Sequence, residues 1–222
     1  MRGKFLFAAL IVTGAVALLV PVLLSHETAT RVDTYSIRAD VPYMVSPPVV
    51  PSEAVFAGDT VDLRRYDMRE RMDRELMSFT YMHSSTMLII KKANRLYPVI
   101  EPILKEQGVP DDLKYLMTIE SNLNMRAVSP AGAAGLWQFM AGTARDNGLE
   151  VNANIDERYN VEKATRAACA HLKSLYERFG DWLTVGAAYN AGHGRIGGER
   201  TRQGREEAVD LWLNEETSRY MF

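Results

Sequence analysis

A single carboxylate interrupts an apolar stripe in the stretch "YLMTIESNLN", residues 115–124. Leu113, Leu116 and Met117 precede Glu120 by seven, four and three residues, which is the spacing of one face of an α-helix. This spacing predicts that Glu120 points inward. Burial and the nearby negative end of the helix would both raise the pKa of its carboxyl group. A carboxylic acid that stays protonated near neutral pH can give its proton to a leaving oxygen, as cleavage of a glycosidic bond requires.

The segment after Glu120 has the composition of a ligand-binding loop. Residues 124–144 read "NMRAVSPAGAAGLWQFMAGTA", with Gly135 ahead of Trp137 and Gln138. Glycine lets the backbone come close to a ligand, and aromatic and amide side chains are common in small-molecule sites. The periodicity alone also allows a Glu that is buried with a purely structural partner, so both interpretations remain open at this point.

Helical patterns account for most of the chain, so the predicted fold class is all-α, with room for a small hairpin in a loop. The predicted helices cover residues 62–97 with a break near 82–87, 99–107, about 111–121, 136–147, 161–179, about 182–191 and 205–217. Pro98 is expected to close the first of them. Asn160, Gly180 and Asp181 are expected to cap helices, and the Gly- and Arg-rich residues 193–204 are expected to form a mobile loop.

The N-terminus has the features of an export signal. Arg2 and Lys4 precede an uncharged apolar run, residues 5–24, which predicts a signal peptide or a signal anchor over residues 1–24. A Pro-rich segment, residues 25–58, is predicted to be an extended linker. The predicted organisation continues with a helical extension over residues 59–97 and a main domain over residues 98–222.

Composition argues against several classes of function. The formal net charge is −2, which gives no basic surplus for binding nucleic acid. The four histidines and the single Cys169 form no metal-ligand motif, so no metal site and no cofactor are predicted. Cys169 lies beside the apolar stripe of the helix over residues 161–179 and is expected to be a small buried thiol.

Three ordered motifs carry a resemblance to a known family. They are "IESNLN…AVSPAGAAGLWQFM", "DERYNVEKATRAACAHLKSLYERFGDW" and "AAYNAGHGRI", within about residues 97–220. In these motifs the chain resembles the membrane-bound lytic murein transglycosylases of the SLT-domain family. The resemblance implies a lysozyme-like helical domain whose cleft accepts peptidoglycan glycan strands. It also implies an enzyme that forms a 1,6-anhydromuramoyl end without water.

The resemblance assigns roles to particular residues. It implies that Glu120 is the general acid and then the general base, and that Tyr189 orients it by a hydrogen bond. The implied substrate-binding residues are Ser129, Gln138, Met140, Ala188, Tyr189 and Asn190. Trp137 stays open between core packing and sugar stacking.

Two other functions remain open at this stage. A hydrolytic muramidase would need a second carboxylate near Glu120, and Asp146, Glu150, Asp156 and Glu157 are candidates if the chain folds back. A tethered glycan-binding scaffold would keep the cleft without turnover. The export signal and the implied substrate together predict the periplasmic side of a bacterial cell envelope, with residues 5–24 as an inner-membrane anchor and with protein partners unknown.

Overall fold

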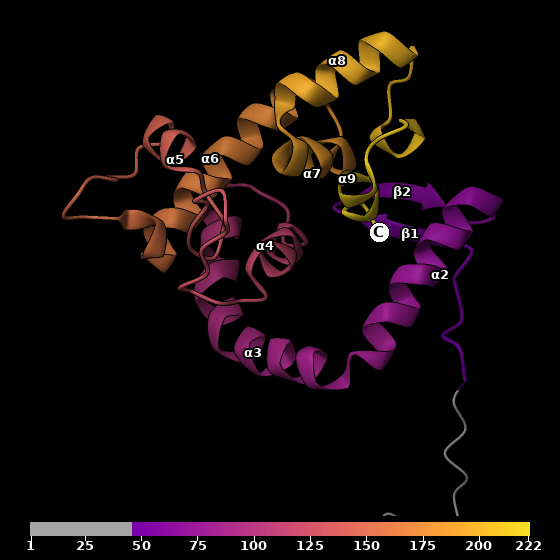
Figure 1. The fold of residues 1–222 in the computed structure, drawn as a ribbon, viewed down its shortest axis with the longest axis horizontal. Coiled ribbons are helices and arrows are strands. Elements are labelled where there is room, and N and C mark those ends of the chain that lie inside the picture. Colours follow the sequence, from indigo (N-terminus) through magenta and orange to yellow (C-terminus); the bar gives the residue numbers. More distant parts are fainter. Residues whose placement is uncertain (1–45) are drawn as a thin grey trace, which may run out of the picture. The chain divides into compact units, whose positions relative to one another are not determined.

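The computed structural model describes residues 46–222, and residues 47–222 form one compact unit. The predicted signal or anchor, residues 1–24, and residues 25–45 of the predicted linker lie outside the described residues. The elements follow in the order β1 (Glu53–Phe56), β2 (Asp59–Asp62), α2 (Tyr66–Tyr81), α3 (His83–Glu106), α4 (Leu113–Ser121), α5 (Ala141–Asp146), the 3₁₀ turn η1 (Glu157–Tyr159), α6 (Val161–Phe179), α7 (Trp182–Ala191), α8 (His193–Gln203), the 3₁₀ turn η2 (Ala208–Asp210) and α9 (Glu215–Arg219). The described chain is therefore mostly helical (Figure 1).

The described residues contain a two-stranded antiparallel hairpin, β1 and β2, for which the all-α prediction left room. Its turn is made by Ala57 and Gly58, both with positive φ (53° and 96°), which suits a two-residue hairpin connection. Asp59 accepts hydrogen bonds from the backbone N–H groups of Trp182 and Leu183 and so joins the hairpin to the start of α7. The end of the predicted linker thus contains a strand that packs on the domain.

The break predicted near residues 82–87 is confirmed, because α2 ends at Tyr81 and α3 begins at His83. The prediction that Pro98 closes this helix is wrong, since α3 continues through Pro98 and Pro102 to Glu106. Each proline removes one backbone donor, but both are exposed and one turn apart, so water can satisfy the carbonyl groups left without a partner. The predicted short helix over residues 99–107 is therefore the second half of α3, and the predicted domain boundary at residues 97 and 98 falls inside it.

The helix predicted over residues 136–147 is shorter than expected, because α5 covers only Ala141–Asp146. Leu136, Trp137 and Phe139 are buried in a tight turn instead. Gln138 has a φ of 47°, and Ala134 forms a β-bridge with Phe139. A left-handed residue inside the predicted first turn is incompatible with a continuous helix.

Two predictions near the C-terminus are also corrected. Residues 193–204 do not form a loop, because α8 covers His193–Gln203, with Ile196 fully buried and Gly204 in the left-handed conformation at its end. The helix predicted over residues 205–217 is replaced by η2, an extended segment and the short α9. Thr184 accepts a hydrogen bond from the Ala208 N–H at 3.1 Å, so a side chain holds this backbone in a non-helical path.

The central helices α6 and α7 agree with the predicted ranges and caps. Asn160 accepts a hydrogen bond from the Lys163 N–H at 3.0 Å, and Asp181 accepts one from the Thr184 N–H at 2.6 Å. Gly180 has a φ of 82° at the end of α6. The core forms around these helices, and its largest buried side chains include Leu172 and Val185 together with α3 and α4 residues.

A stability prediction follows from the cap of α6. We expect Asn160→Ala to lower the free energy of unfolding by about 1 kcal/mol, because the Lys163 N–H loses its acceptor. Thermal unfolding followed by circular dichroism would measure this. Asn160→Asp keeps an acceptor at the same place and should stay close to the parent protein; a loss as large as that of the Ala variant would contradict the cap interpretation.

Helix α2 is tied to the C-terminal segment by charged side chains. Arg219 donates two hydrogen bonds to the nearly buried carboxylate of Glu75, at 2.7 and 2.9 Å, and these hold the pKa of Glu75 below its ordinary value. Arg65 contacts Asp210 at 2.6 Å, and Arg74 contacts Glu215 at 3.3 Å. Helix α2 and the C-terminal segment are therefore held together by these charged side chains.

Candidate active site

Glu120 lies in the last turn of α4, as the apolar stripe predicts. Leu113, Leu116 and Met117 on the same helix are buried. The helix ends at Asn122 and Leu123, which both adopt positive φ, 47° and 54°. Burial is the main cause of a raised pKa of the Glu120 carboxyl, and the negative charge of Glu216 adds to it. The acid is thus positioned on a rigid element and biased toward its protonated form.

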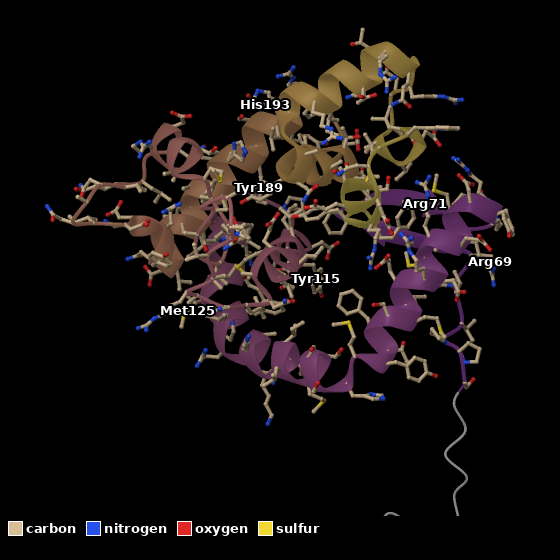
Figure 2. All side chains as sticks on the ribbon, viewed as in Figure 1. Arg69, Arg71, Tyr115, Met125, Tyr189 and His193 are labelled. Carbon is tan, nitrogen blue, oxygen red and sulfur yellow. The ribbon has the colours of Figure 1, made fainter. Side chains whose placement is uncertain are left out.

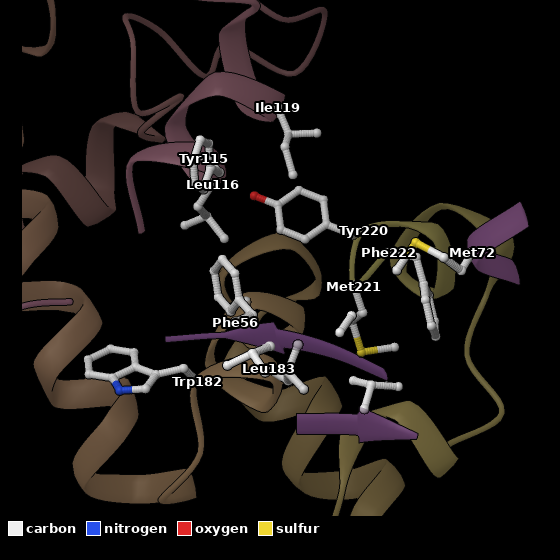
Figure 3. Close-up of a pocket in the computed structure, with 14 residues that line it drawn as sticks. Phe56, Met72, Tyr115, Leu116, Ile119, Trp182, Leu183, Tyr220, Met221 and Phe222 are labelled. Carbon is white, nitrogen blue, oxygen red and sulfur yellow. The ribbon is translucent and has the colours of Figure 1, made fainter. Parts of the chain in front are cut away.

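Tyr220 is the hydrogen-bond partner of this acid. Its hydroxyl donates to Glu120 Oε1 at 2.7 Å, although 100 residues separate the two in sequence. This bond stabilises the ionised carboxylate and opposes part of the rise in pKa that burial causes. Figure 3 shows the Tyr220 ring beside Ile119, with its oxygen toward α4, at the edge of an apolar pocket of about 240 Å³ that Met221 also lines. The phenol and the acid therefore hold one another in a single orientation.

A cleft of about 810 Å³ lies beside α5, α6 and α7. Five of the residues with implied substrate-binding roles line it: Gln138, Met140, Ala188, Tyr189 and Asn190. Glu120 and Ser129 do not line this cleft. Glu120 is nevertheless close enough to Tyr189 that its negative charge helps raise the pKa of the Tyr189 phenol. Tyr189 and His193 are labelled in Figure 2, where both belong to the α7–α8 side of the molecule.

Tyr189 does not make the hydrogen bond that the resemblance implies. Its hydroxyl donates to the backbone carbonyl of Trp137 at 2.6 Å, because the tight turn brings that carbonyl within reach. The hydrogen bond to Glu120 comes from Tyr220 instead. Tyr189 therefore joins α7 to the Gly-rich loop, and its ring forms part of the cleft wall.

The loop between α4 and α5 is held by its own polar groups. Gln138 donates from Nε2 to the carbonyls of Gly135 at 2.7 Å and Ala127 at 3.2 Å. Ser129 Oγ accepts from the Ala133 N–H at 3.0 Å. These bonds give Gln138 and Ser129 a structural role in shaping the loop in addition to any contact with a ligand.

Trp137 is a core residue. Its side chain is fully buried, and its indole N–H donates to Thr165 Oγ1 on α6 at 3.0 Å. The choice left open by the sequence, between core packing and sugar stacking, is therefore settled in favour of packing. Cys169 is also buried, as predicted, and burial raises the pKa of its thiol to about 11.

Two residues of this region, Tyr220 and His171, were not predicted from the sequence. Tyr220 lies just after a five-residue helix, where periodicity carries no signal. His171 lines the cleft, with its ring centroid 5.6 Å from that of Tyr189 and 6.2 Å from that of Phe139. A signal for His171 existed, because it lies three residues after Ala168 and four before Leu175 on the buried stripe of α6.

The candidate second carboxylates for a two-acid mechanism differ in whether they line the cleft or pair with a neighbouring basic residue. Asp146 lines the cleft. Asp156 binds Arg158 through two side-chain hydrogen bonds, at 2.9 and 2.7 Å, and Glu157 pairs with Lys163 and accepts the Glu150 N–H. Within residues 46–222, no group of three or more His, Cys, Asp or Glu side chains is arranged to hold a metal ion.

Comparison with known proteins gives a family match over the same region. The model of the transglycosylase SLT domain matches residues 97–211, just over half of the chain. The chain belongs to the transglycosylase SLT domain family. This match contains the α4 acid, the Gly-rich loop and the cleft residues of α7 and ends before Tyr220.

Curated relatives extend well beyond this SLT domain. The membrane-bound lytic murein transglycosylase D of Escherichia coli is 34% identical over 159 residues, which is 69% of this chain and 34% of that protein. The membrane-bound lytic murein transglycosylase F of Idiomarina loihiensis is 27% identical, over 66% of this chain and 33% of that protein. The chain thus spans about a third of the length of these relatives. The X-ray structure of an inactive variant of the lytic transglycosylase Slt from Pseudomonas aeruginosa is 26% identical, with a TM-score of 0.44 over 61% of this chain and 22% of that one.

Proposed function

We propose that the protein is a peptidoglycan lytic transglycosylase that cleaves the MurNAc-GlcNAc β-1,4 bond and leaves a 1,6-anhydromuramoyl end. The observation that carries the proposal is the partly buried Glu120 carboxyl, with its raised pKa, hydrogen-bonded by Tyr220 within a domain of the SLT family. The names of the relatives, which describe lytic murein transglycosylases, support the same class of reaction.

The proposed reaction uses one carboxyl group twice. Glu120 first protonates the glycosidic oxygen, and the bond from that oxygen to the muramoyl C1 breaks. The Glu120 carboxylate then accepts the proton of the muramoyl C6 hydroxyl as the C6 oxygen bonds to C1. The acid is regenerated, and no water is consumed. Tyr220 fits this cycle because its hydroxyl donates to the carboxylate form that exists between the two steps.

The glycan is proposed to bind along the cleft of about 810 Å³. Gln138, Ala188 and Asn190 would contact its polar groups, and Met140 and Tyr189 would pack against its apolar faces. Asn190 already accepts a hydrogen bond from Thr217 at 3.0 Å, so its side chain is oriented before substrate arrives. Ser129 is proposed to act through the loop that it shapes and at the edge of this site.

The proposed location is the periplasmic side of a bacterial cell envelope, with attachment to the inner membrane through residues 5–24. Supporting observations are the uncharged apolar run after Arg2 and Lys4 and the membrane-bound relatives. Among the helices of the described residues, none is long and apolar enough to cross a bilayer.

Mass analysis of the products tests the proposal. Incubation of purified peptidoglycan with the detergent-solubilised full chain should release muropeptides that are one water lighter than hydrolytic products and that lack a reducible end. Reducible products of full mass would overturn the transglycosylase proposal. Glycan binding without any turnover would instead indicate a non-catalytic scaffold.

The second candidate function is hydrolysis by a muramidase mechanism. The observation that favours it is that Asp146, one of the four candidate carboxylates, lines the cleft. A hydrolase that used it to activate water would lose activity in Asp146→Asn. The transglycosylase proposal expects this variant to retain most of its turnover.

We expect Tyr220→Phe to lower kcat by about 10- to 100-fold, because Glu120 loses the hydrogen bond that orients it. The same bond lowers the pKa of Glu120, so its loss raises that pKa further. The high-pH limb of the kcat profile should therefore move to higher pH. Tyr189→Phe is the matched control. It removes a hydrogen bond to Trp137 and should leave that limb in place; the reverse pattern would assign the orienting role to Tyr189.

A further inference from the structure

Large apolar side chains are exposed around the junction of α2 and α3. Six of them lie within 14 residues, each between 37% and 57% exposed: Met77, Phe79, Met82, Met87, Leu88 and Ile90. We call these six residues the elbow surface. Because residues two apart face different sides of a helix, these side chains surround the helix junction instead of forming one flat face. Exposed apolar side chains gathered at one place are unusual on a water-facing surface and mark a contact with another apolar phase or molecule.

The fold does not use the elbow surface for its own packing. Helix α3 enters the core through its second half, where Leu96, Ile100, Ile103 and Leu104 are buried. In Figure 1 the junction of α2 and α3 lies at the edge of the described unit, apart from α5 to α8. The apolar residues there are therefore free of the constraints that fix the core.

Charge is distributed sharply along this segment. Residues 76–90, "LMSFTYMHSSTMLII", contain no Lys, Arg, Asp or Glu. Lys91 follows immediately and Arg95 comes one turn later, and both are exposed. Met87, Lys91 and Arg95 are spaced four residues apart and so share one stripe of α3. The uncharged apolar segment is thus bordered by basic groups on its α3 side, whereas Asp73, Arg74 and Glu75 of mixed charge precede it on α2.

We propose that the elbow surface inserts into the interfacial layer of a bilayer that contains anionic lipid. The apolar tip would enter the boundary between headgroups and acyl chains, and Lys91 and Arg95 would contact the lipid phosphates. A glycan strand offers too little apolar surface to cover six such side chains, and basic groups beside an uncharged tip match a phosphate layer. This inference does not depend on the catalytic proposal.

Site-directed spin labelling of the full chain tests the proposal. Cys169, the single native cysteine, is buried, so a cysteine introduced at Leu88 or Met82 can be labelled selectively. The chain would be reconstituted into vesicles of phosphatidylethanolamine and phosphatidylglycerol, and collisions of the label with oxygen and with a water-soluble nickel complex would be measured. We expect the nickel collision rate at Leu88 to be several-fold lower, and the oxygen rate higher, than at a surface position away from the elbow surface in the same vesicles. Val55→Cys, 62% exposed on β1, is the control and should remain accessible to nickel.

Three results would overturn the proposal. Labels at Leu88 and Val55 that are equally accessible to nickel in the presence of vesicles would show that the elbow surface stays in water. Spin–spin broadening between labels at Leu88 would identify a second copy of the chain as the occupant. A label at Leu88 that is shielded from both nickel and oxygen in the vesicles would mean that another segment of the same chain covers the surface.

A charge variant distinguishes membrane contact by the elbow surface from membrane attachment by the N-terminal segment, because all variants keep that segment. We expect Lys91→Glu combined with Arg95→Glu to reverse most of the protection from nickel at Leu88. Lys105→Glu changes an exposed charge at the far end of α3 and should leave the protection intact. Equal protection in the two charge variants would exclude the basic border from the interaction.

Discussion

Glu120→Gln should lower peptidoglycan turnover by about a thousandfold, without loss of glycan binding. Glutamine keeps the size of the side chain and can still accept the hydrogen bond of Tyr220, but its amide N–H groups are not acidic enough to protonate the glycosidic oxygen. The measurement is the rate of muropeptide release under single-turnover conditions, beside a sedimentation assay for binding to insoluble peptidoglycan. Glu216→Gln removes the nearby charge that helps raise the pKa of Glu120 and provides a control that keeps the acid.

Stability supplies an independent check on this variant. The folded-state pKa of Glu120 is raised mainly by burial, so the folded protein holds its proton more tightly than the unfolded chain does. This contribution is fully present below the unfolded-state pKa and is lost as the pH rises through the folded-state pKa. Glu120→Gln has no such loss, so we expect it to unfold at the same temperature as the parent or higher at neutral pH. A markedly lower unfolding temperature would mean that lost activity reflects unfolding and not the missing acid. It would also contradict the conclusion that burial raises the pKa of Glu120.

Gly135→Ala should destabilise the domain by about 3 to 5 kcal/mol and lower its unfolding temperature by roughly 10 °C. A Cβ atom at residue 135 would lie 2.0 Å from the backbone oxygen of Arg158, and the φ of +79° also disfavours any side chain. Arg158 cannot move away easily. Its guanidinium is bound to Asp156 and donates to the carbonyls of Gly132 at 2.8 Å and Phe139 at 2.9 Å. Differential scanning calorimetry would measure the loss.

Gly132→Ala is the matched control for this prediction. Gly132 has a similar φ of +87°, but a Cβ atom there would meet no heavy atom within 4 Å. It should therefore show only the cost of the left-handed backbone, about 1 kcal/mol. If the two variants are equally destabilised, the close approach between Gly135 and Arg158 is not important for stability.

Local patterns explain how much of this molecule could be predicted from its sequence. Periodicity places Glu120 on the buried face of α4 correctly, and short-range cap chemistry identifies the ends of α6 at Asn160 and Gly180. These features depend on residues within one or two turns of each other. Helix α8 was missed because its glycines resemble loop residues, whereas the burial of Ile196 against other elements decides its conformation.

The partner of the acid could not be found in the same way. Tyr220 reaches Glu120 only because the C-terminal segment packs against α2 and α7, and no local spacing connects residues that are 100 positions apart. The resemblance directed attention to Tyr189, which is near the acid but is committed to the carbonyl of Trp137. The sequence could therefore identify the acid, whereas the identity of its donor depends on tertiary packing.

Glu75 pairs with Arg219, which lies 144 residues later in the chain, so this contact can form only near the end of synthesis. The neighbouring Tyr220 reaches Glu120 only when the last helical turn docks on α2, so the acid acquires its donor late. A nascent chain can form its central helices from local contacts before the hydrogen bond between Tyr220 and Glu120 exists. Molecules that end before residue 220, through incomplete synthesis or proteolysis, contain the Glu120 carboxyl group without the phenol that donates to it.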